Sequence, residues 1–449
     1  MKKAVFLFIA ACMSLLSVHG QTDTWGYEYQ NEIPTWVEQL QADLTYPLAW
    51  GHDKEKRFSK WKKKARAKVL ECMMTAPPVA EDYAMTVLGE ERRDGYTAKK
   101  IEFSLSRYYR VKAYLLVPDG KGPFPAINLL HDHGAHLSIG KEKMVKPFAV
   151  DSAVVKDADA WVTNLYDGRY LGDELARRGY VVFTTDAPLW GERGRREGVD
   201  RNKYDIIAGN MMMLGRDLSA MMTYDDMAGT EFLASLPEVD PERIGCAGCS
   251  MGGYRSWMLA ALSDRIKASC TICWMVTTEA QLTHRYGRKE NGGFANCIPA
   301  LRQWLDYPHI ASLACPQPML FIAGRTDKLF PLPGVEAAFA TMHEVWRSQG
   351  VDDRLETLIL DHPHGCPLAD QEKMMEFFDK WLGNTHPNPP KGRGRIPILV
   401  KKAWRSTANR GLRKAFNFSA GHTNTQKDSP CHPFHCSSQQ SVAFQTALQ

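Results

Sequence analysis

The stretch Arg243-Ile-Gly-Cys-Ala-Gly-Cys-Ser-Met-Gly-Gly-Tyr254 predicts a short apolar strand, a sharp turn centred on Ser250, and a helix that runs on to Leu262. Its central residues Gly248-Cys-Ser-Met-Gly252 follow the pattern G-x-S-x-G, in which a serine stands on a strained turn between a strand and a helix. The neighbours of such a serine must be small because the two backbones nearly touch. The turn also puts the hydroxyl at a helix N-terminus, where free N–H groups and the helix dipole favour a developing oxyanion. We therefore predict that Ser250 is a nucleophile and that the N–H of Met251 is one oxyanion donor.

Two later strands supply partners for this serine. The apolar run 317–324 is followed by Asp327, and the run 355–360 is followed by His364. An aspartate after one strand can fix the tautomer of a histidine after another, and that histidine can then act as general base on the serine. The order Ser250, Asp327, His364 is the order of the catalytic residues in α/β-hydrolases. We predict these three residues as catalytic.

Other residues compete for two of these places. His362 lies two positions before His364 and is the alternative base, although His364 is preferred because it lies deeper in the loop. Glu279 follows the preceding strand and could be the acid in place of Asp327, as could Asp361 through its proximity to the histidines. The sequence leaves these alternatives open.

The loop His131-Asp-His-Gly-Ala-His136 follows a buried strand predicted over residues 125–130. We predict that it supplies the second oxyanion N–H, from His133 or Gly134, because the glycine lets the backbone approach a substrate. A metal site is the competing interpretation, since the loop contains the spacing H-x-H-x-x-H in His131, His133 and His136. It resembles the metallo-β-lactamase motif H-x-H-x-D-H, but alanine replaces the aspartate at position 135, which favours the oxyanion loop.

A third loop, residues 187–193, follows the strand predicted over residues 180–186. Loops at the carboxyl ends of strands line the ligand crevice of an open α/β sheet. Trp190 and Arg193 are therefore candidate substrate contacts. The alternative for Arg193 is a structural pair with Glu192 that holds the loop.

The order of strand and helix patterns predicts the fold class. Residues 84–118 contain antiparallel-looking strands, and the later strands are continuously apolar, as buried parallel strands are. Helices are predicted between them, and the helix over 224–236 is expected to turn its acidic residues outward: Asp225, Asp226 and Glu231. Residues 139–168 show no clear period, and residues 276–308 predict a cap over the site. We expect an α/β-hydrolase fold with a mostly parallel central sheet, helices on both faces, an N-terminal helical extension and a cap insertion.

The two ends of the chain differ in composition from its middle. Residues 1–20 have the form of an export signal, with a basic start, an apolar core too short to span a membrane, and a small-residue cleavage site. Cys12 ends a stretch that resembles a lipobox, so lipid anchoring there is the less favoured alternative. We predict a helical extension over 21–80, a catalytic domain over 81–383, and a basic, disordered tail over 384–449. The protein is expected to be exported, periplasmic or extracellular, without a membrane span.

Charge and cysteine usage exclude other classes of protein. The formal charge is +5, but residues 384–449 alone carry +9, which leaves −4 for the rest and no signature of nucleic-acid binding. The eleven cysteines include two C-x-x-C pairs, Cys246/Cys249 and Cys270/Cys273, whose spacing resembles a zinc ribbon. Both pairs fall in predicted buried strands, so we predict small core residues instead. No cofactor is expected.

Residues from about Trp36 to Gly383 resemble the dienelactone-hydrolase-like branch of the α/β-hydrolase superfamily, and are most similar to exported bacterial esterases of the acetyl xylan esterase type. The resemblance is carried by residues 130–134, 186–193, 248–253, 324–327 and 364–365. It implies that Ser250 is the nucleophile, Asp327 the acid and His364 the base of a serine esterase, with an ester-bearing plant polysaccharide or oligosaccharide as substrate. It also implies oxyanion donors in Met251 and in the loop 133–135.

The chain departs from the related cephalosporin-deacetylase pattern at two places. It has His133-Gly-Ala135 where that pattern has R-G-Q, and Met251 where that pattern has glutamine. An acetyl ester and the methyl ester of a uronic acid are therefore both candidate substrates, and Arg193 could face neighbouring carboxylates in the second case. A metal-dependent hydrolase built on the three histidines and a serine peptidase on the same scaffold are the alternative functions. The oligomeric state is left open.

Overall fold

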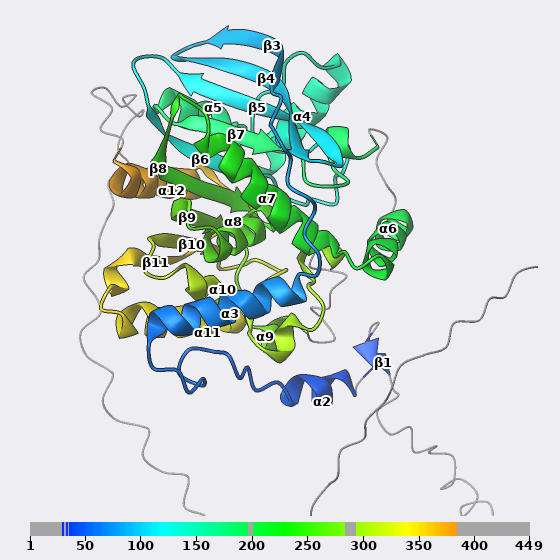
Figure 1. Ribbon diagram of the computed structural model, residues 1–449, viewed down its shortest axis with the longest axis vertical. Coiled ribbons are helices and arrows are strands. Elements are labelled where there is room, and N and C mark those ends of the chain that lie inside the picture. Colours follow the sequence, from blue (N-terminus) through cyan, green and yellow to red (C-terminus); the bar gives the residue numbers. More distant parts are fainter. Residues whose placement is uncertain (1–28, 31–32, 35, 196–200, 283–292, 384–449) are drawn as a thin grey trace, which may run out of the picture. The chain divides into compact units, whose positions relative to one another are not determined.

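The computed structural model describes residues 29–30, 33–34, 36–195, 201–282 and 293–383 (Figure 1). The predicted export signal (1–20) and tail (384–449) lie outside these residues, and the domain boundaries stay predictions. Two short strands, β1 (Tyr29–Gln30) and β2 (Ile33–Pro34), pair with each other. No helix among the described residues is long and apolar enough to cross a membrane.

A nine-stranded sheet with the order β11-β10-β9-β8-β6-β7-β5-β4-β3 forms the centre of the fold. The strands from β11 to β7 are parallel, and β5, β4 and β3 pair antiparallel at one end. The mostly parallel sheet is therefore confirmed. The strands are β3 (Thr86–Arg93), β4 (Tyr96–Ser106), β5 (Tyr109–Pro118), β6 (Phe124–Leu130), β7 (Val181–Thr185), β8 (Val239–Cys249), β9 (Ile266–Ile272), β10 (Met319–Gly324) and β11 (Leu355–Leu360).

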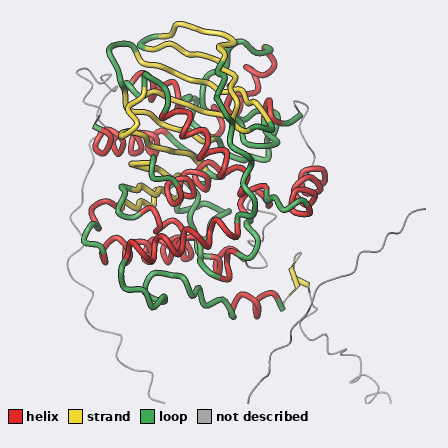
Figure 2. The backbone as a smooth tube through the Cα atoms, viewed as in Figure 1, coloured by secondary structure: helices red, strands yellow, loops and turns green. Residues whose placement is uncertain are grey.

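Helices cover both faces of this sheet (Figure 2). One face packs against α3 (Phe58–Cys72), α7 (Leu218–Ala234), α8 (Met251–Leu262), α10 (Tyr307–Ala311) and α11 (Leu332–Ser348). The other packs against α4 (Ser152–Leu165), α5 (Leu171–Arg177) and α12 (Leu368–Leu382). Successive residues of a strand point to opposite faces, and accordingly Cys246 of β8 lies in the first core and Ala247 in the second.

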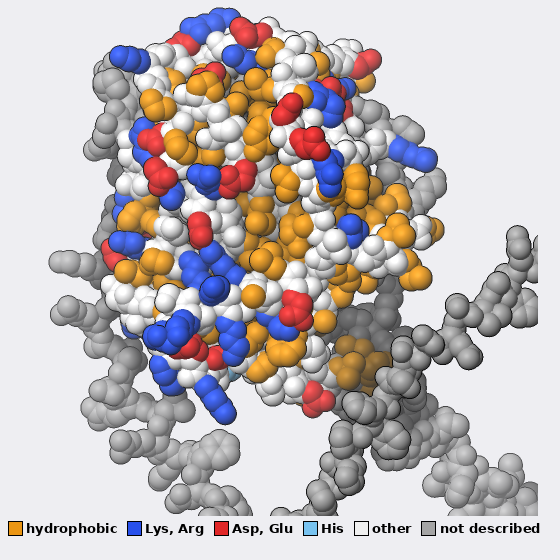
Figure 3. All heavy atoms as spheres, in the orientation of Figure 1, with side chains coloured by type: hydrophobic (Ala, Val, Ile, Leu, Met, Phe, Trp, Pro, Cys, Tyr) orange, Lys and Arg blue, Asp and Glu red, His pale blue; other side chains and the backbone are white. Residues whose placement is uncertain are grey.

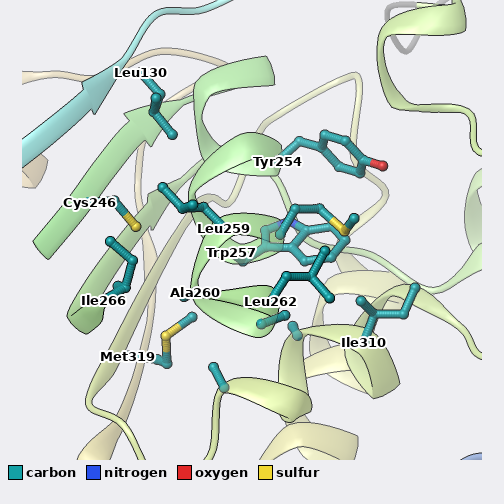
Figure 4. Close-up of a cluster of buried hydrophobic side chains, with 14 of the residues drawn as sticks. Leu130, Cys246, Tyr254, Trp257, Leu259, Ala260, Leu262, Ile266, Ile310 and Met319 are labelled. Atoms are coloured by element: carbon teal, nitrogen blue, oxygen red, sulfur yellow. The ribbon is translucent and has the colours of Figure 1, made fainter. Parts of the chain in front are cut away.

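The centre of the first core is α8, which follows the turn at Ser250 and is buried at every position. Figure 4 shows its side chains between the sheet and the surrounding helices, with Leu259 close to Cys246 and Ile266. Tyr254 and Trp257 are fully buried and their rings meet edge to face at 4.9 Å. Burying a large apolar side chain contributes about 1.5–3 kcal/mol. Packing thus fixes α8, and with it the turn that starts the helix.

The sequence of helix α3 explains which of its faces packs against the core. Trp61, Ala65 and Val69 recur at intervals of four residues and are buried, whereas Lys60, Lys63 and Lys64 are exposed. Figure 3 shows basic side chains gathered over this part of the surface. The amphipathic pattern therefore directs one face of the helix to the core.

One prediction about the helices is wrong, and one helix was not predicted. Asp225 and Asp226 of α7 are buried, not outward, because both are ion-paired: Asp226 Oδ1 lies 2.6 Å from Nη2 of Arg255. Residues 139–168, which show no sequence period, contain the 3₁₀ turn η1 (Lys141–Lys143) and the helix α4. Asp151 caps α4 by accepting a hydrogen bond from the N–H of Ala153, and that aspartate was the signal available in the sequence.

Candidate active site

Ser250 lies on a strained turn between β8 and α8. Its φ of 57° and ψ of −124° lie outside the regions that side chains prefer. The turn is held by a hydrogen bond of 2.8 Å from the N–H of Ser250 to the carbonyl oxygen of Ile272. A Cβ on Gly252 would lie 2.0 Å from the carbonyl oxygen of Leu130, and one on Gly248 would lie 2.4 Å from the backbone of Gly252. The glycines therefore allow the close approach that the sequence pattern predicts.

Three side chains from separate loops meet at this turn. The hydroxyl of Ser250 lies 2.9 Å from Nε2 of His364, and Nδ1 of His364 lies 2.7 Å from Oδ2 of Asp327. Nδ1–H donates to the carboxylate, which leaves Nε2 as the acceptor for the hydroxyl proton. Asp327 is held in turn, because its Oδ1 accepts a hydrogen bond of 2.8 Å from the N–H of Leu329. The arrangement can carry a proton from a hydroxyl to an imidazole.

His364 has a raised pKa that reflects this environment. Burial alone would lower the pKa of the imidazole, but the hydrogen bond to Asp327 and the charge of that carboxylate raise it above its ordinary value. About a fifth of the His364 side chain remains exposed, against 2% for Asp327. The ring of Phe330 stacks on the imidazole at 5.9 Å and shields one of its faces. The imidazole of His364 is thus oriented from two sides while one edge stays exposed.

The competing base and acids lie elsewhere. Nε2 of His362 faces Oδ2 of Asp370 at 3.1 Å, and its Nδ1 faces the carbonyl of Pro363. Asp361 is exposed and pairs with Arg325 at 2.7 Å. Glu279 is an exposed residue of the short helix α9 (Thr278–Gln281). Of the predicted candidates, the structure brings together Ser250, His364 and Asp327.

The loop after β6 lies beside the serine turn and is tightly held. Nζ of Lys143 lies 3.1 Å from the carbonyl oxygens of both Asp132 and His133. Gly134 has a φ of +60°, and a Cβ there would lie 2.2 Å from the ring of Trp161. The glycine that the sequence predicts is therefore required by both conformation and space. Lys143 was not predicted, since it lies in the stretch without sequence period.

The three histidines of this loop do not form a metal site. His131 is fully buried, with Nε2 accepting from the N–H of Ala187 at 2.9 Å and Nδ1 donating to the carbonyl of Asp132. Burial, together with nearby cations, lowers its pKa well below the ordinary value, so the ring is neutral. His136 instead pairs with Asp157 at 2.7 Å and stacks on Trp161. None of these three histidines belongs to a group of converging metal ligands in the described part of the chain.

Three other clusters of potential ligand atoms occur among the described residues. One is the His364 and Asp327 pair with Cys273, and another combines Cys273 with His362 and Asp370. The third contains three buried or half-buried carboxylates, and its members are Glu142, Asp186 and Glu192. The ammonium of Lys141 lies between these carboxylates, at 3.0, 2.7 and 2.7 Å. A lysine thus already supplies the positive charge that this third cluster needs.

Trp190 and Arg193, the two predicted substrate contacts, are both held by contacts within the protein. Trp190 is fully buried, donates from Nε1 to the carbonyl of His133 at 3.3 Å, and packs edge-on against the His133 ring. Arg193 pairs with Asp225 at 2.7 Å and donates to the carbonyl of Asp186. The predicted Glu192 partner of Arg193 is wrong, because Glu192 faces lysines instead: Lys100, Lys112 and Lys141. Both residues shape the loop 187–193, and their contact with substrate stays a prediction.

The comparison with protein families decides the identity of this fold. The model of the Abhydrolase family matches residues 34–345, which is more than half of the chain. The chain belongs to the Abhydrolase family. This Abhydrolase chain is 28% identical over 306 residues to "Putative hydrolase YtaP" of Bacillus subtilis (strain 168), a match that covers 68% of the chain and 95% of the relative. The chain is therefore a hydrolase with the α/β-hydrolase fold.

Solved structures share the fold of this Abhydrolase chain at low sequence identity. A putative acetyl xylan esterase from Bacteroides fragilis has a TM-score of 0.57 at 20% identity, covering 72% of this chain and 81% of the other. A glucuronoyl esterase from Solibacter usitatus has a TM-score of 0.52 at 15% identity, covering 76% of this chain and 99% of the other. At these identities the likeness shows the fold alone.

An apolar cluster adjoins the serine turn of the Abhydrolase site. It joins Met251 to Trp190, to Tyr204 and Ala208 of α6 (Arg201–Met213), and to Ala295 of the 3₁₀ turn η4 (Gly293–Asn296). Part of the predicted cap, residues 276–308, thus packs beside the serine, although residues 283–292 lie outside the described ones. The cluster gives the site an apolar side next to Ser250.

The four cysteines of the C-x-x-C pairs are free, buried thiols. Cys246 and Cys249 lie on β8, Cys270 lies on β9, and Cys273 follows β9. Burial raises the pKa of Cys246 to about 12, so its thiol stays protonated at neutral pH. The interpretation of these residues as core residues is confirmed.

Proposed function

We propose that this chain is a serine carboxylic-ester hydrolase whose catalytic residues are Ser250, His364 and Asp327. One observation carries the proposal: the continuous path of 2.9 Å and 2.7 Å from the hydroxyl through the imidazole to the carboxylate. That path supplies an activated nucleophile, a base whose pKa Asp327 raises, and a group that orients the base. The strained turn at the start of α8 supports the same assignment.

The reaction proceeds through an acyl-enzyme. Ser250 Oγ attacks the ester carbonyl while His364 Nε2 takes its proton, and the charge forms on the former carbonyl oxygen. The N–H of Met251, at the first position of α8, has no partner within the helix and donates to this oxyanion. The loop at His133 and Gly134 supplies the second donor. His364 then protonates the leaving alcohol, and a water molecule activated by the same imidazole releases the acid.

The substrate class rests on the fold neighbours and on the sequence. Structures with this fold carry the names acetyl xylan esterase, glucuronoyl esterase and methylesterase. We infer an acetyl or methyl ester borne on a plant polysaccharide or oligosaccharide, reached by an exported enzyme. The form of residues 1–20 supports export.

A panel of polysaccharides tests this function. Acetylated, methyl-esterified and feruloylated polymers are incubated with the wild-type protein and with Ser250→Ala, and the released acid or alcohol is measured. We expect release from at least one polymer, its loss in Ser250→Ala, and no effect of a metal chelator. A peptide substrate in the same panel separates the esterase from a serine peptidase. Release from none of the esters by folded wild-type protein would contradict the proposal.

A further inference from the structure

The carbonyl side of the loop after β6 faces a buried lysine. Nζ of Lys143 lies 3.1 Å from the carbonyl oxygen of Asp132, 3.1 Å from that of His133 and 3.1 Å from Oδ2 of Asp132. The side chains of Lys143 and Asp132 are both fully buried. A buried ammonium destabilises the folded protein unless it is paired and hydrogen-bonded. An apolar residue at position 143 would avoid this destabilisation. The partners of Lys143 indicate what it does.

Other donors complete the same arrangement. The carbonyl oxygen of His133 also accepts from Nε1 of Trp190 and from the N–H of His136, each at 3.3 Å. Oδ1 of Asp132 accepts from Nε1 of Trp161 at 3.1 Å and from the hydroxyl of Tyr166 at 2.7 Å. The acid that pairs with Lys143 is therefore itself fixed, and the loop has one defined backbone conformation.

Fixing the carbonyl of His133 also fixes the direction of the Gly134 N–H, which belongs to the same peptide group. The peptide between His133 and Gly134 is trans, so its C=O and its N–H point in opposite directions. Since Lys143 and Trp190 hold the C=O on the interior side, the N–H of Gly134 points away from them. A cation at the carbonyl oxygen polarises the amide and strengthens its N–H as a donor.

We propose that Lys143 is a positioning residue, which orients and polarises the His133–Gly134 peptide so that its N–H stabilises the oxyanion formed on attack by Ser250. The inference rests on the proposed ester hydrolysis and adds to it a residue that does not touch the substrate. Burial lowers the pKa of the Lys143 ammonium, and the charge of Asp132 and its hydrogen bond oppose that shift. The lysine therefore acts on the reaction only through the loop.

Steady-state kinetics of Lys143→Met with p-nitrophenyl acetate test the proposal. Losing one oxyanion donor lowers kcat by about 10²-fold or more, and we expect such a fall with KM changed by less than about threefold. Lys62→Met is the matched control. Its Nζ also donates to a backbone carbonyl, that of Cys315, at 2.9 Å. Cys315 precedes β10, so this contact lies at the amino ends of the parallel strands, whereas Ser250 lies at their carboxyl ends. This control should keep the wild-type kcat.

A double variant separates positioning from stability. Lys143→Met leaves the buried carboxylate of Asp132 unpaired, which lowers Tm as well as activity. Adding Asp132→Asn removes that charge and keeps an oxygen for Tyr166 and Trp161. We expect the double variant to recover Tm but not kcat, because the ammonium at the His133 carbonyl is still missing. Recovery of both together would overturn the positioning role.

A transition-state analogue gives an independent readout. A trifluoromethyl ketone adds to the serine as a tetrahedral adduct, so its affinity should fall in parallel with kcat/KM in Lys143→Met. Covalent labelling of Ser250 by a fluorophosphonate should show that the nucleophile is still present. Unchanged analogue affinity, or a kcat within about threefold of wild type, would overturn the inference. If wild-type protein hydrolyses no ester at all, the proposed function fails instead, which is a distinguishable result.

Discussion

Replacing Gly252 by alanine tests how closely α8 must approach β6. The new Cβ would lie 2.0 Å from the carbonyl oxygen of Leu130, where side-chain carbons essentially never come closer than 3.0 Å. The start of α8 must therefore move by about 1 Å, and the hydrogen bond between Ser250 and His364, now 2.9 Å, would stretch beyond its normal range. A misplacement of about 1 Å at a reacting group costs about 10²-fold in rate. Overpacking adds a loss of about 1–3 kcal/mol in the free energy of unfolding.

The assay combines kcat/KM for p-nitrophenyl acetate with urea unfolding followed by circular dichroism. Gly209→Ala is the matched control, since Gly209 lies within helix α6 and a Cβ there would meet nothing within 4 Å. The control should keep its activity and gain up to about 1 kcal/mol of stability. If Gly252→Ala keeps kcat/KM within about threefold of wild type, the close approach is not what positions Ser250.

Three further results are expected. Asp327→Asn should lower kcat by about 10⁴-fold. The acid limb of the pH–rate profile should also move to lower pH, because the carboxylate raises the pKa of His364 and only the neutral imidazole is a base. An unmoved acid limb would contradict this. Arg255→Met should lower the unfolding free energy by about 3–5 kcal/mol, because it leaves the buried carboxylate of Asp226 without its cation. Removing the half-exposed Arg265–Glu231 pair should lower it by only about 0–1 kcal/mol. Equal losses would refute this difference between buried and exposed pairs. In the native protein Cys246 and Cys270 should resist a thiol reagent that labels them after unfolding. Both thiols are fully buried, and burial raises their pKa. Rapid labelling of the native protein would refute their place in the core.

The strands and the serine turn could be predicted because their signals are local. A continuous apolar run marks each buried strand, and the small residues around Ser250 mark the turn. The edge of a parallel sheet then brings the loops of Asp327 and His364 to that turn, although the choice of His364 over His362 depends on the loop's final path.

The charged partners could not be predicted because they come from distant parts of the chain. Asp226 pairs with Arg255, which follows it by 29 positions on another helix, so a helical period alone assigns it to the surface. Arg193 likewise pairs with Asp225 and not with the adjacent Glu192. Lys143 could not be predicted for a different reason, since the loop that it holds is only ten residues upstream but the stretch around it shows no sequence period.

The proposed mechanism depends most on Ser250 as an activated nucleophile. Incubation of the folded wild-type protein with a fluorophosphonate, followed by intact mass and peptide mapping, measures this directly. We predict one adduct, located on Ser250, and a large loss of labelling rate in His364→Ala. A folded protein that forms no adduct, or forms it on another residue, would contradict this mechanism.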